Sequence, residues 1–329
     1  MLSPAYFRLS LIALLLALAV VMLGAYTRLT DAGLGCPDWP GCYGHLTVPN
    51  TPTEIAHAES TYKQAVEPAK AWKEMVHRYV AGILGLIIAV LAIWAVRRRR
   101  HYANQPVGIP IFLVLFVAFQ ALLGMWTVTW LVLPLIVTSH LLGGMIITGL
   151  LGYLTLATRP HPPYVHVNPK FKPWVILGLI ILMIQIFLGA WTSTNYAAIV
   201  CLDFPGCHGN LFPTMDFQRA FDLFHPIGVN YEGGVLDTTA RVTIQMTHRY
   251  GAFITATYLG LLGISLLFSR GLRATGWVLL AILALQLSLG IANIVWVLPI
   301  SVAVLHNGVA AVLVLVIVTL LYQLYRKSP

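Results

Sequence analysis

Eight apolar stretches, each long enough to cross a bilayer as a helix, dominate the hydrophobic pattern of this 329-residue chain. The hydrocarbon core of a membrane is about 30 Å thick, so a spanning helix needs about 20 apolar residues. Polar segments separate the stretches, which cover about residues 8–27, 77–96, 109–130, 139–158, 174–194, 248–268, 275–296 and 303–324. The pattern therefore predicts an all-α integral membrane protein with eight transmembrane helices.

The composition agrees with a membrane protein, because 58% of the residues are hydrophobic and only 9% are charged. Soluble domains carry about 25% charged residues. The net charge of +9 raises the question of a nucleic-acid partner, but the basic residues gather on one side of alternating helices: Arg97, Arg98, Arg99, Arg100, Arg159, Lys170, Lys172, Arg270, Arg273, Arg326 and Lys327. The positive-inside rule then places both termini in the cytoplasm. We expect contact with anionic membrane lipid and no nucleic-acid partner.

An internal repeat divides the chain into two copies of one plan. Segment 36–42 (CPDWPGC) matches segment 201–207 (CLDFPGC) at an offset of 165 residues, and segment 74–79 (EMVHRY) matches segment 245–250 (QMTHRY) at an offset of 171. Each copy holds four predicted spans, and an even number of spans returns the chain to its starting side. The halves should therefore be parallel repeats, related by an axis along the membrane normal.

The repeat predicts two tandem pseudo-symmetric four-helix bundles, a scaffold that binds cofactors between facing helices. Residues 1–159 form the N-terminal half and residues 174–329 the C-terminal half. A cytoplasmic linker rich in proline and histidine, residues 160–173, joins them.

One histidine recurs at the start of every even-numbered predicted span: His77, His140, His248 and His306. Each lies 19–22 residues before a basic residue of the inner flank, which puts all four about 30 Å from the cytoplasmic surface. Two facing imidazoles suit hexacoordinate heme iron, whereas zinc needs three or four ligands of mixed type. We expect two hemes, one per half. The alternative is that each histidine is a polar anchor at the membrane interface.

Arg78 and Arg249 directly follow two of these histidines. An arginine at the outer interface can pair with a heme propionate through charge-assisted hydrogen bonds. The alternative role is to extend toward the lipid headgroups.

The two halves differ three residues before those same histidines, where Glu74 corresponds to Gln245. Residues i and i+3 share a helix face, so both side chains should point toward a cofactor space. A carboxylate can accept a proton or stabilise developing positive charge, and an amide cannot. This difference places chemistry in the N-terminal half, unless Glu74 is a solvated residue at a helix start, where the helix dipole favours it.

All four cysteines lie in the two long loops predicted on the outer face, as the pairs Cys36 with Cys42 and Cys201 with Cys207. An extracytoplasmic compartment is oxidising enough for disulfides. We expect two disulfides that fold the loops over the heme sites, with redox-active thiols as the alternative.

Together these features resemble the heme A synthase family. The motifs that carry the resemblance are the tandem halves and Glu74, His77, Arg78, His140, His248, Arg249, His306, Cys36 and Cys42. The resemblance implies oxidation of the C8 methyl of heme O to a formyl group, through an alcohol and a gem-diol, to give heme A. It also implies that His248 and His306 bind a resident heme b, that His77 and His140 bracket the substrate heme, and that Glu74 is essential.

The resemblance further implies terminal oxidase subunits and a heme O synthase as partners. The absence of a transit-peptide-like leader favours a bacterial plasma membrane, and Gly143 and Gly144 allow close helix contact within a bundle or in a homo-oligomer. Two other functions compete with the enzyme. One is a di-heme b electron carrier linked to quinol, and the other is a heme or lipid transporter, since repeats and inward polar residues also mark transport paths.

Overall fold

Helices form the regular structure of the chain in the computed structural model, which describes residues 4–100, 105–160 and 167–326. Within these ranges there is no β-strand, and eight helices are long and apolar enough to cross a membrane. They are α1 (Pro4–Leu29), α3 (Pro68–Arg99), α4 (Gly108–Thr129), α5 (Pro134–Thr158), α6 (Lys172–Thr194), α8 (Thr238–Leu267), α9 (Arg273–Val295) and α10 (Ile300–Tyr325). The prediction of an all-helical chain with eight potential spans is confirmed.

Three short helical segments lie between the long helices: α2 (Pro52–Tyr62), the 3₁₀ turn η1 (Pro169–Phe171) and α7 (Phe217–Ala220). The predicted linker, 160–173, is described only in part. Residues 161–166 lie outside the described ranges, as does Lys327, and η1 leads directly into α6.

The even-numbered spans begin earlier than their apolar stretches. Helices α3 and α8 start nine and ten residues before their histidines, and α5 and α10 start six residues before theirs. Proline in the first turn favours these starts in α3 and α5, and the Asp237 side chain caps α8 by accepting from the Ala240 backbone amide. The prediction that the histidines open their helices is therefore wrong. They lie inside continuous helix, with polar turns on the outer side.

The same tight turn joins α4 to α5 and α9 to α10. In this turn, two successive non-glycine residues have positive φ. The φ angles are 51° at Leu131 and 54° at Val132 in the first turn, and 55° at Val297 and 58° at Leu298 in the second. Such residues rarely adopt this conformation. The amides of Val132 and Leu298 compensate by donating back to carbonyls of the preceding helix, at 2.8 and 2.7 Å. The two halves of the chain therefore share the backbone conformation of this turn as well as its sequence.

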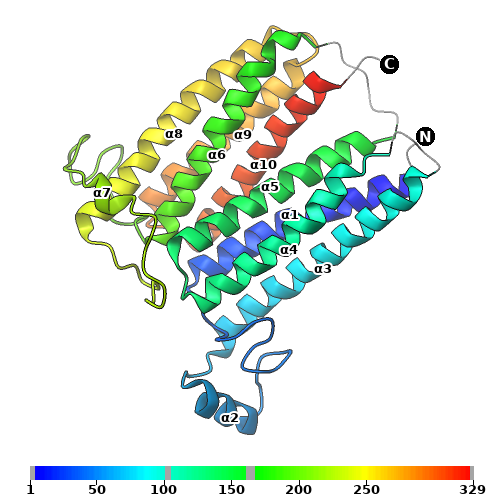
Figure 1. Ribbon diagram of the computed structural model, residues 1–329. Coiled ribbons are helices and arrows are strands. Elements are labelled where there is room, and N and C mark those ends of the chain that lie inside the picture. Colours follow the sequence, from blue (N-terminus) through cyan, green and yellow to red (C-terminus); the bar gives the residue numbers. More distant parts are fainter. Residues whose placement is uncertain (1–3, 101–104, 161–166, 327–329) are drawn as a thin grey trace.

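Helices α1, α3, α4 and α5 pack on one another, and so do α6, α8, α9 and α10 (Figure 1). Across the middle, α10 contacts both α1 and α5, and α5 also contacts α6. Glycines bring α5 close to α10: a Cβ added at Gly149 would lie 3.3 Å from Val314, and one at Gly152 would overlap the Leu315 side chain. Close packing of small residues on apolar ones holds the two sets together.

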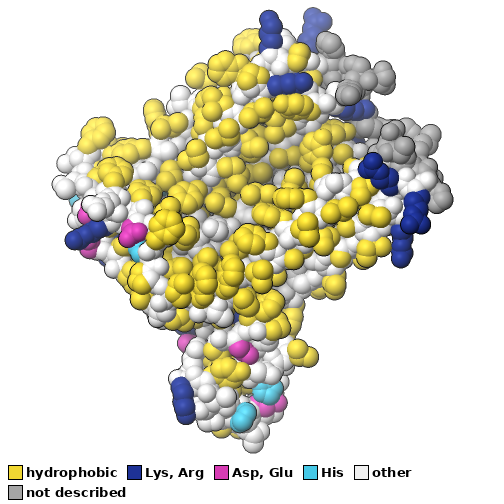
Figure 2. Space-filling model, viewed as in Figure 1, with side chains coloured by type: hydrophobic (Ala, Val, Ile, Leu, Met, Phe, Trp, Pro, Cys, Tyr) yellow, Lys and Arg dark blue, Asp and Glu magenta, His cyan; other side chains and the backbone are white. Residues whose placement is uncertain are grey.

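The polar ends of the molecule differ in charge. The first residues of α1 and the last of α10 lie at one end, and the loops that contain α2 and α7 lie at the other (Figure 1). Lysine and arginine side chains gather mainly at the first end, whereas acidic and histidine side chains are visible near the loops (Figure 2). The apolar surface between these ends is formed by the long helices.

Candidate functional site

A largely apolar cavity of about 2060 Å³ extends through both halves and is lined by His77, His140, His248 and His306. Pockets for single small ligands are usually about 300–1,000 Å³. The space is therefore larger than one such ligand requires. Glu74 and Gln245 also line it, as expected from their position one turn before a histidine.

Each of the four imidazoles rests against a glycine of a neighbouring helix. A Cβ added at any of these glycines would lie 3.0–3.4 Å from Cε1 of the facing ring. The pairs are Gly24 with His77, Gly124 with His140, Gly189 with His248, and Gly290 with His306. Close helix approach at glycine thus restricts where each ring can lie. Sequence analysis did not single out these glycines as ring contacts, although Gly24 and Gly189, like Gly124 and Gly290, occur within matching segments of the repeat.

In the N-terminal half, His77 and His140 face each other across the cavity. Their ring centres are 6.4 Å apart and their planes are inclined by 82°. An imidazole nitrogen binds a metal at about 2.0–2.1 Å and lies about 1.2 Å from its ring centre, so two axial imidazoles on one iron need ring centres about 6–6.5 Å apart. The spacing of this pair fits a hexacoordinate iron.

In the C-terminal half, two glutamines accompany the imidazoles. Gln185 Nε2 lies 3.0 Å from Nδ1 of His248, and Gln286 Nε2 lies 3.2 Å from Nε2 of His306. Gln185 corresponds to Val20 at the repeat offset of 165 residues, so His77 lacks such a side-chain partner. Sequence analysis missed this difference, although the offset alone is enough to find it.

The Nδ1 atoms of His77, His140 and His306 are buried, and no side chain in the described part of the chain hydrogen-bonds to them. There is also no cluster there of three or more His, Cys, Asp or Glu side chains that could hold a metal ion. A zinc site of the usual kind needs such a cluster. Paired imidazoles that line a large apolar cavity instead fit iron porphyrin.

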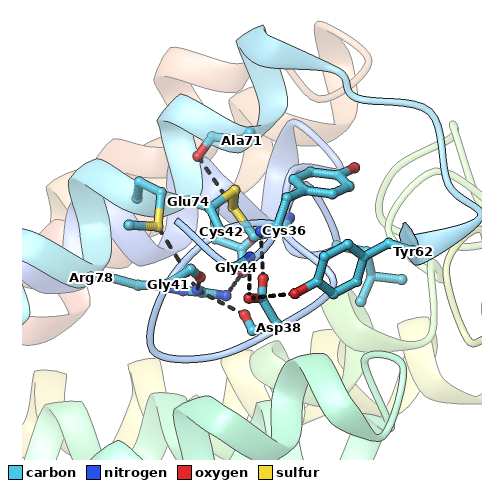
Figure 3. The surroundings of a disulfide bond; sticks show 12 residues. Cys36, Asp38, Gly41, Cys42, Gly44, Tyr62, Ala71, Glu74 and Arg78 are labelled. Carbon is cyan, nitrogen blue, oxygen red and sulfur yellow. Dashed lines mark hydrogen bonds and ion pairs between the residues drawn. A yellow bond between two sulfur atoms is a disulfide. The ribbon is translucent and has the colours of Figure 1, made fainter. Parts of the chain in front are cut away.

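Glu74 is buried and joins α3 to the first disulfide loop (Figure 3). Its carboxylate accepts from the Cys36 backbone amide at 2.9 Å and from Arg78 Nη2 at 2.5 Å. Arg78 Nη1 donates to the carbonyls of Asp38 and Gly41. With 4% of its surface exposed, Glu74 is not the solvated residue of the alternative interpretation.

Arg249 holds the second disulfide loop in a similar way. Its Nη1 donates to the carbonyls of Asp203 and Gly206, and its Nη2 donates to that of Cys201 at 2.7 Å. Gln245 donates to a further loop carbonyl at 3.3 Å. Both arginines of the repeat thus anchor loops, a role that sequence analysis did not predict. Their role toward propionates stays a prediction.

The two cysteine pairs form disulfides, as predicted: Cys36 with Cys42 and Cys201 with Cys207. An aspartate within each ring stabilises the following turn, since Asp38 accepts from two backbone amides at 2.6 and 2.8 Å and Asp203 from two at 2.8 Å. Backbone amides that donate to the Asp203 carboxylate lower its pKa. Residues 39–40 and 204–205, inside the rings, line the cavity, so the loops lie at its outer end.

Comparison with known proteins agrees with these features. The family model of cytochrome oxidase assembly proteins matches residues 7–318. The heme A synthase of Shewanella oneidensis is 48% identical over 320 residues, which cover 96% of each chain. The heme A synthase of Sphingopyxis alaskensis is 30% identical over 344 residues, covering 95% of this chain and 90% of its own. The chain therefore belongs to the family of cytochrome oxidase assembly proteins.

Proposed function

We propose that this protein catalyses the heme A synthase reaction, in which the C8 methyl of heme O becomes the formyl group of heme A. Counted with water as the oxygen source, the methyl carbon gains one oxygen atom and releases four protons and four electrons, which an external electron acceptor must take up. It passes through an alcohol and a gem-diol, which loses water. The observation that carries the proposal is the facing pair His77 and His140, 6.4 Å apart, with Glu74 lining the same cavity.

Under this proposal the N-terminal pair brackets the substrate heme, and His248 and His306 hold a resident heme b. That heme supplies one-electron redox chemistry when bound. Glu74 accepts a proton or stabilises positive charge that develops on the substrate, and Arg78 fixes its carboxylate by the hydrogen bond at 2.5 Å. The C-terminal half has an amide at the corresponding position, so proton transfer belongs to the N-terminal half.

We also propose the topology in which both termini are cytoplasmic and the disulfide loops lie on the outer face of a bacterial plasma membrane. The gathering of basic side chains at the end away from the loops supports it (Figure 2). Residues 1–159 and 174–329 would form the two tandem four-helix bundles, which the contacts among α1, α3, α4 and α5 and among α6, α8, α9 and α10 support. Terminal oxidase subunits would receive the product.

Pigment extraction after expression with and without a heme O synthase tests the function. The enzyme should contain heme b in both cases and should also yield heme O, its alcohol or heme A when heme O is supplied. A di-heme electron carrier would contain heme b alone in both, and that result would remove the proposed activity.

A further inference from the structure

Arg241 lies in the outer part of α8, on the same face as two residues already described. It precedes Gln245 by four residues and His248 by seven, and all three line the cavity. Seven residues are about two helical turns, which place Arg241 about 10 Å farther along the axis from His248, toward the loops.

The guanidinium of Arg241 has no counter-charge in the described part of the chain. Its Nε is buried without a hydrogen-bond partner, and no carboxylate there forms an ion pair with it. The nearest acidic residue in sequence, Asp237, is paired with Arg219 at 2.8 Å. Arg241 as a whole is half-buried, and even partial burial of an unpaired charge is unfavourable. The position therefore suits an anionic ligand.

The acidic residues that line the cavity are also engaged elsewhere. Asp31 accepts from Arg28 at 3.3 Å and from Tyr196 at 2.8 Å, and Glu74 is bound to Arg78. Arg78 and Arg249, which follow two of the histidines, donate guanidinium hydrogen bonds to loop carbonyls. Arg241 is the described arginine at this cavity whose guanidinium still lacks an acceptor.

We propose that Arg241 binds a propionate carboxylate of the heme held between His248 and His306. This inference rests on the proposed function. The planar guanidinium matches a carboxylate in bidentate geometry, and heme carries its two carboxylates along one edge of the macrocycle. An arginine about two turns from an axial ligand, on the same helix face, is placed to meet that edge.

The residue of the N-terminal half that corresponds to Arg241 lies away from the cavity. At the repeat offset of 171 residues, Arg241 corresponds to Lys70, which pairs with Glu67 at 3.1 Å. Lys70 is absent from the described residues that line the cavity. Under the proposed function, the product heme of the N-terminal half has no arginine at this position and can leave. The resident heme of the C-terminal half has Arg241 there and is retained.

The test measures how fast heme and heme dimethyl ester dissociate from the full-length protein in detergent, reconstituted in a His77→Ala background. In this variant, the remaining bis-imidazole spectrum reports heme held by His248 and His306. We expect the protein to retain heme about 10- to 100-fold longer than the ester, the range for hydrogen bonds to a charged group. The Arg241→Gln variant should release heme and heme dimethyl ester at similar rates. The matched control Lys70→Gln should retain heme longer than the ester by the same factor as the parent protein.

Unchanged discrimination in Arg241→Gln would overturn the inference, and so would equal retention of heme and ester by the parent protein. If Arg241→Gln does not accumulate, Arg241→Lys replaces it. Lysine keeps the charge but lacks the planar guanidinium that binds a carboxylate through two hydrogen bonds. The ratio of heme retention to ester retention should therefore fall about threefold or more. An unchanged ratio would again overturn the inference. Absence of heme b from the unmodified protein would instead defeat the proposed function.

Discussion

The two halves of the molecule share a scaffold but differ in the polar groups that it presents to the cavity. In both, imidazoles rest against glycines, and an arginine after one histidine anchors a disulfide loop. Among the repeat positions that differ, three change a polar group: Val20 corresponds to Gln185, Lys70 to Arg241, and Glu74 to Gln245. The first half has a carboxylate that can exchange a proton. The second has neutral and cationic groups, which we propose orient and retain a ligand.

Under the proposed function, one repeated plan supports two tasks. Backbone features, which are costly to change, are kept, including the turns with positive φ before α5 and α10. Side chains that face the cavity can change without altering helix packing. Division of labour between the halves therefore depends on few residues, and substitutions at them should separate the two tasks.

Loss of an imidazole should break the comparison most strongly. We expect His306→Ala to lose nearly all low-spin resident heme, because one axial ligand is absent. His140→Ala should keep that heme and stop conversion of heme O. Pigment extraction with low-spin spectra measures both, and His57→Ala, an exposed histidine of α2, is the control. Equal loss of both hemes in both variants would contradict separate sites.

Glu74→Gln gives the N-terminal half the amide of the C-terminal half. Because Gln245 occupies the matching buried position, the fold should accept the change and heme should remain bound. Conversion of heme O should fall at least about 100-fold, the lower range for loss of a general acid or base. Product formation per bound heme measures this, with Glu67→Gln, exposed at the start of α3, as the control. Full activity would remove Glu74 from the mechanism.

Gly189→Ala tests whether ring placement depends on helix contact. The new Cβ would lie 3.0 Å from His248 Cε1, and overpacking of this kind costs about 1–3 kcal/mol. Thermal unfolding should shift downward and the low-spin spectrum of the resident heme should change. Gly260→Ala, also in a long helix but with nothing within 4 Å of its added Cβ, should not destabilise the protein. Similar behaviour of both variants would mean that the glycine contact does not matter.

Gln185→Val makes the smallest change and copies Val20 of the N-terminal half. It removes the hydrogen bond to His248 at 3.0 Å, so we expect a loss of about 0.5–1.5 kcal/mol of stability and broader low-spin electron paramagnetic resonance lines. Ile184→Val, at an exposed neighbour on the same helix, should leave both unchanged. Identical spectra for the two variants would show that Gln185 does not orient the ring.

Local properties of the chain were sufficient to predict much of this architecture. The length of the apolar stretches determined eight helices, since a bilayer requires about 20 apolar residues per span. The Cys-x5-Cys pairs determined two disulfides, because closing such a ring needs only neighbouring residues. The regular recurrence of His77, His140, His248 and His306 marked the cavity without knowledge of any contact.

Other features depend on contacts between distant segments, which one-dimensional patterns do not contain. Polar outer turns hid the true starts of α3 and α8. Both starts pack on the disulfide loops, and the Asp237 side chain also caps α8. The loop carbonyls that bind Arg78 lie about 40 residues away in sequence, in a loop whose path depends on a disulfide and on the turn that Asp38 stabilises. Which residues are available for chemistry can be predicted from the chain alone. Which of them have partners and which, like Arg241 Nε, have none depends on how distant segments pack together.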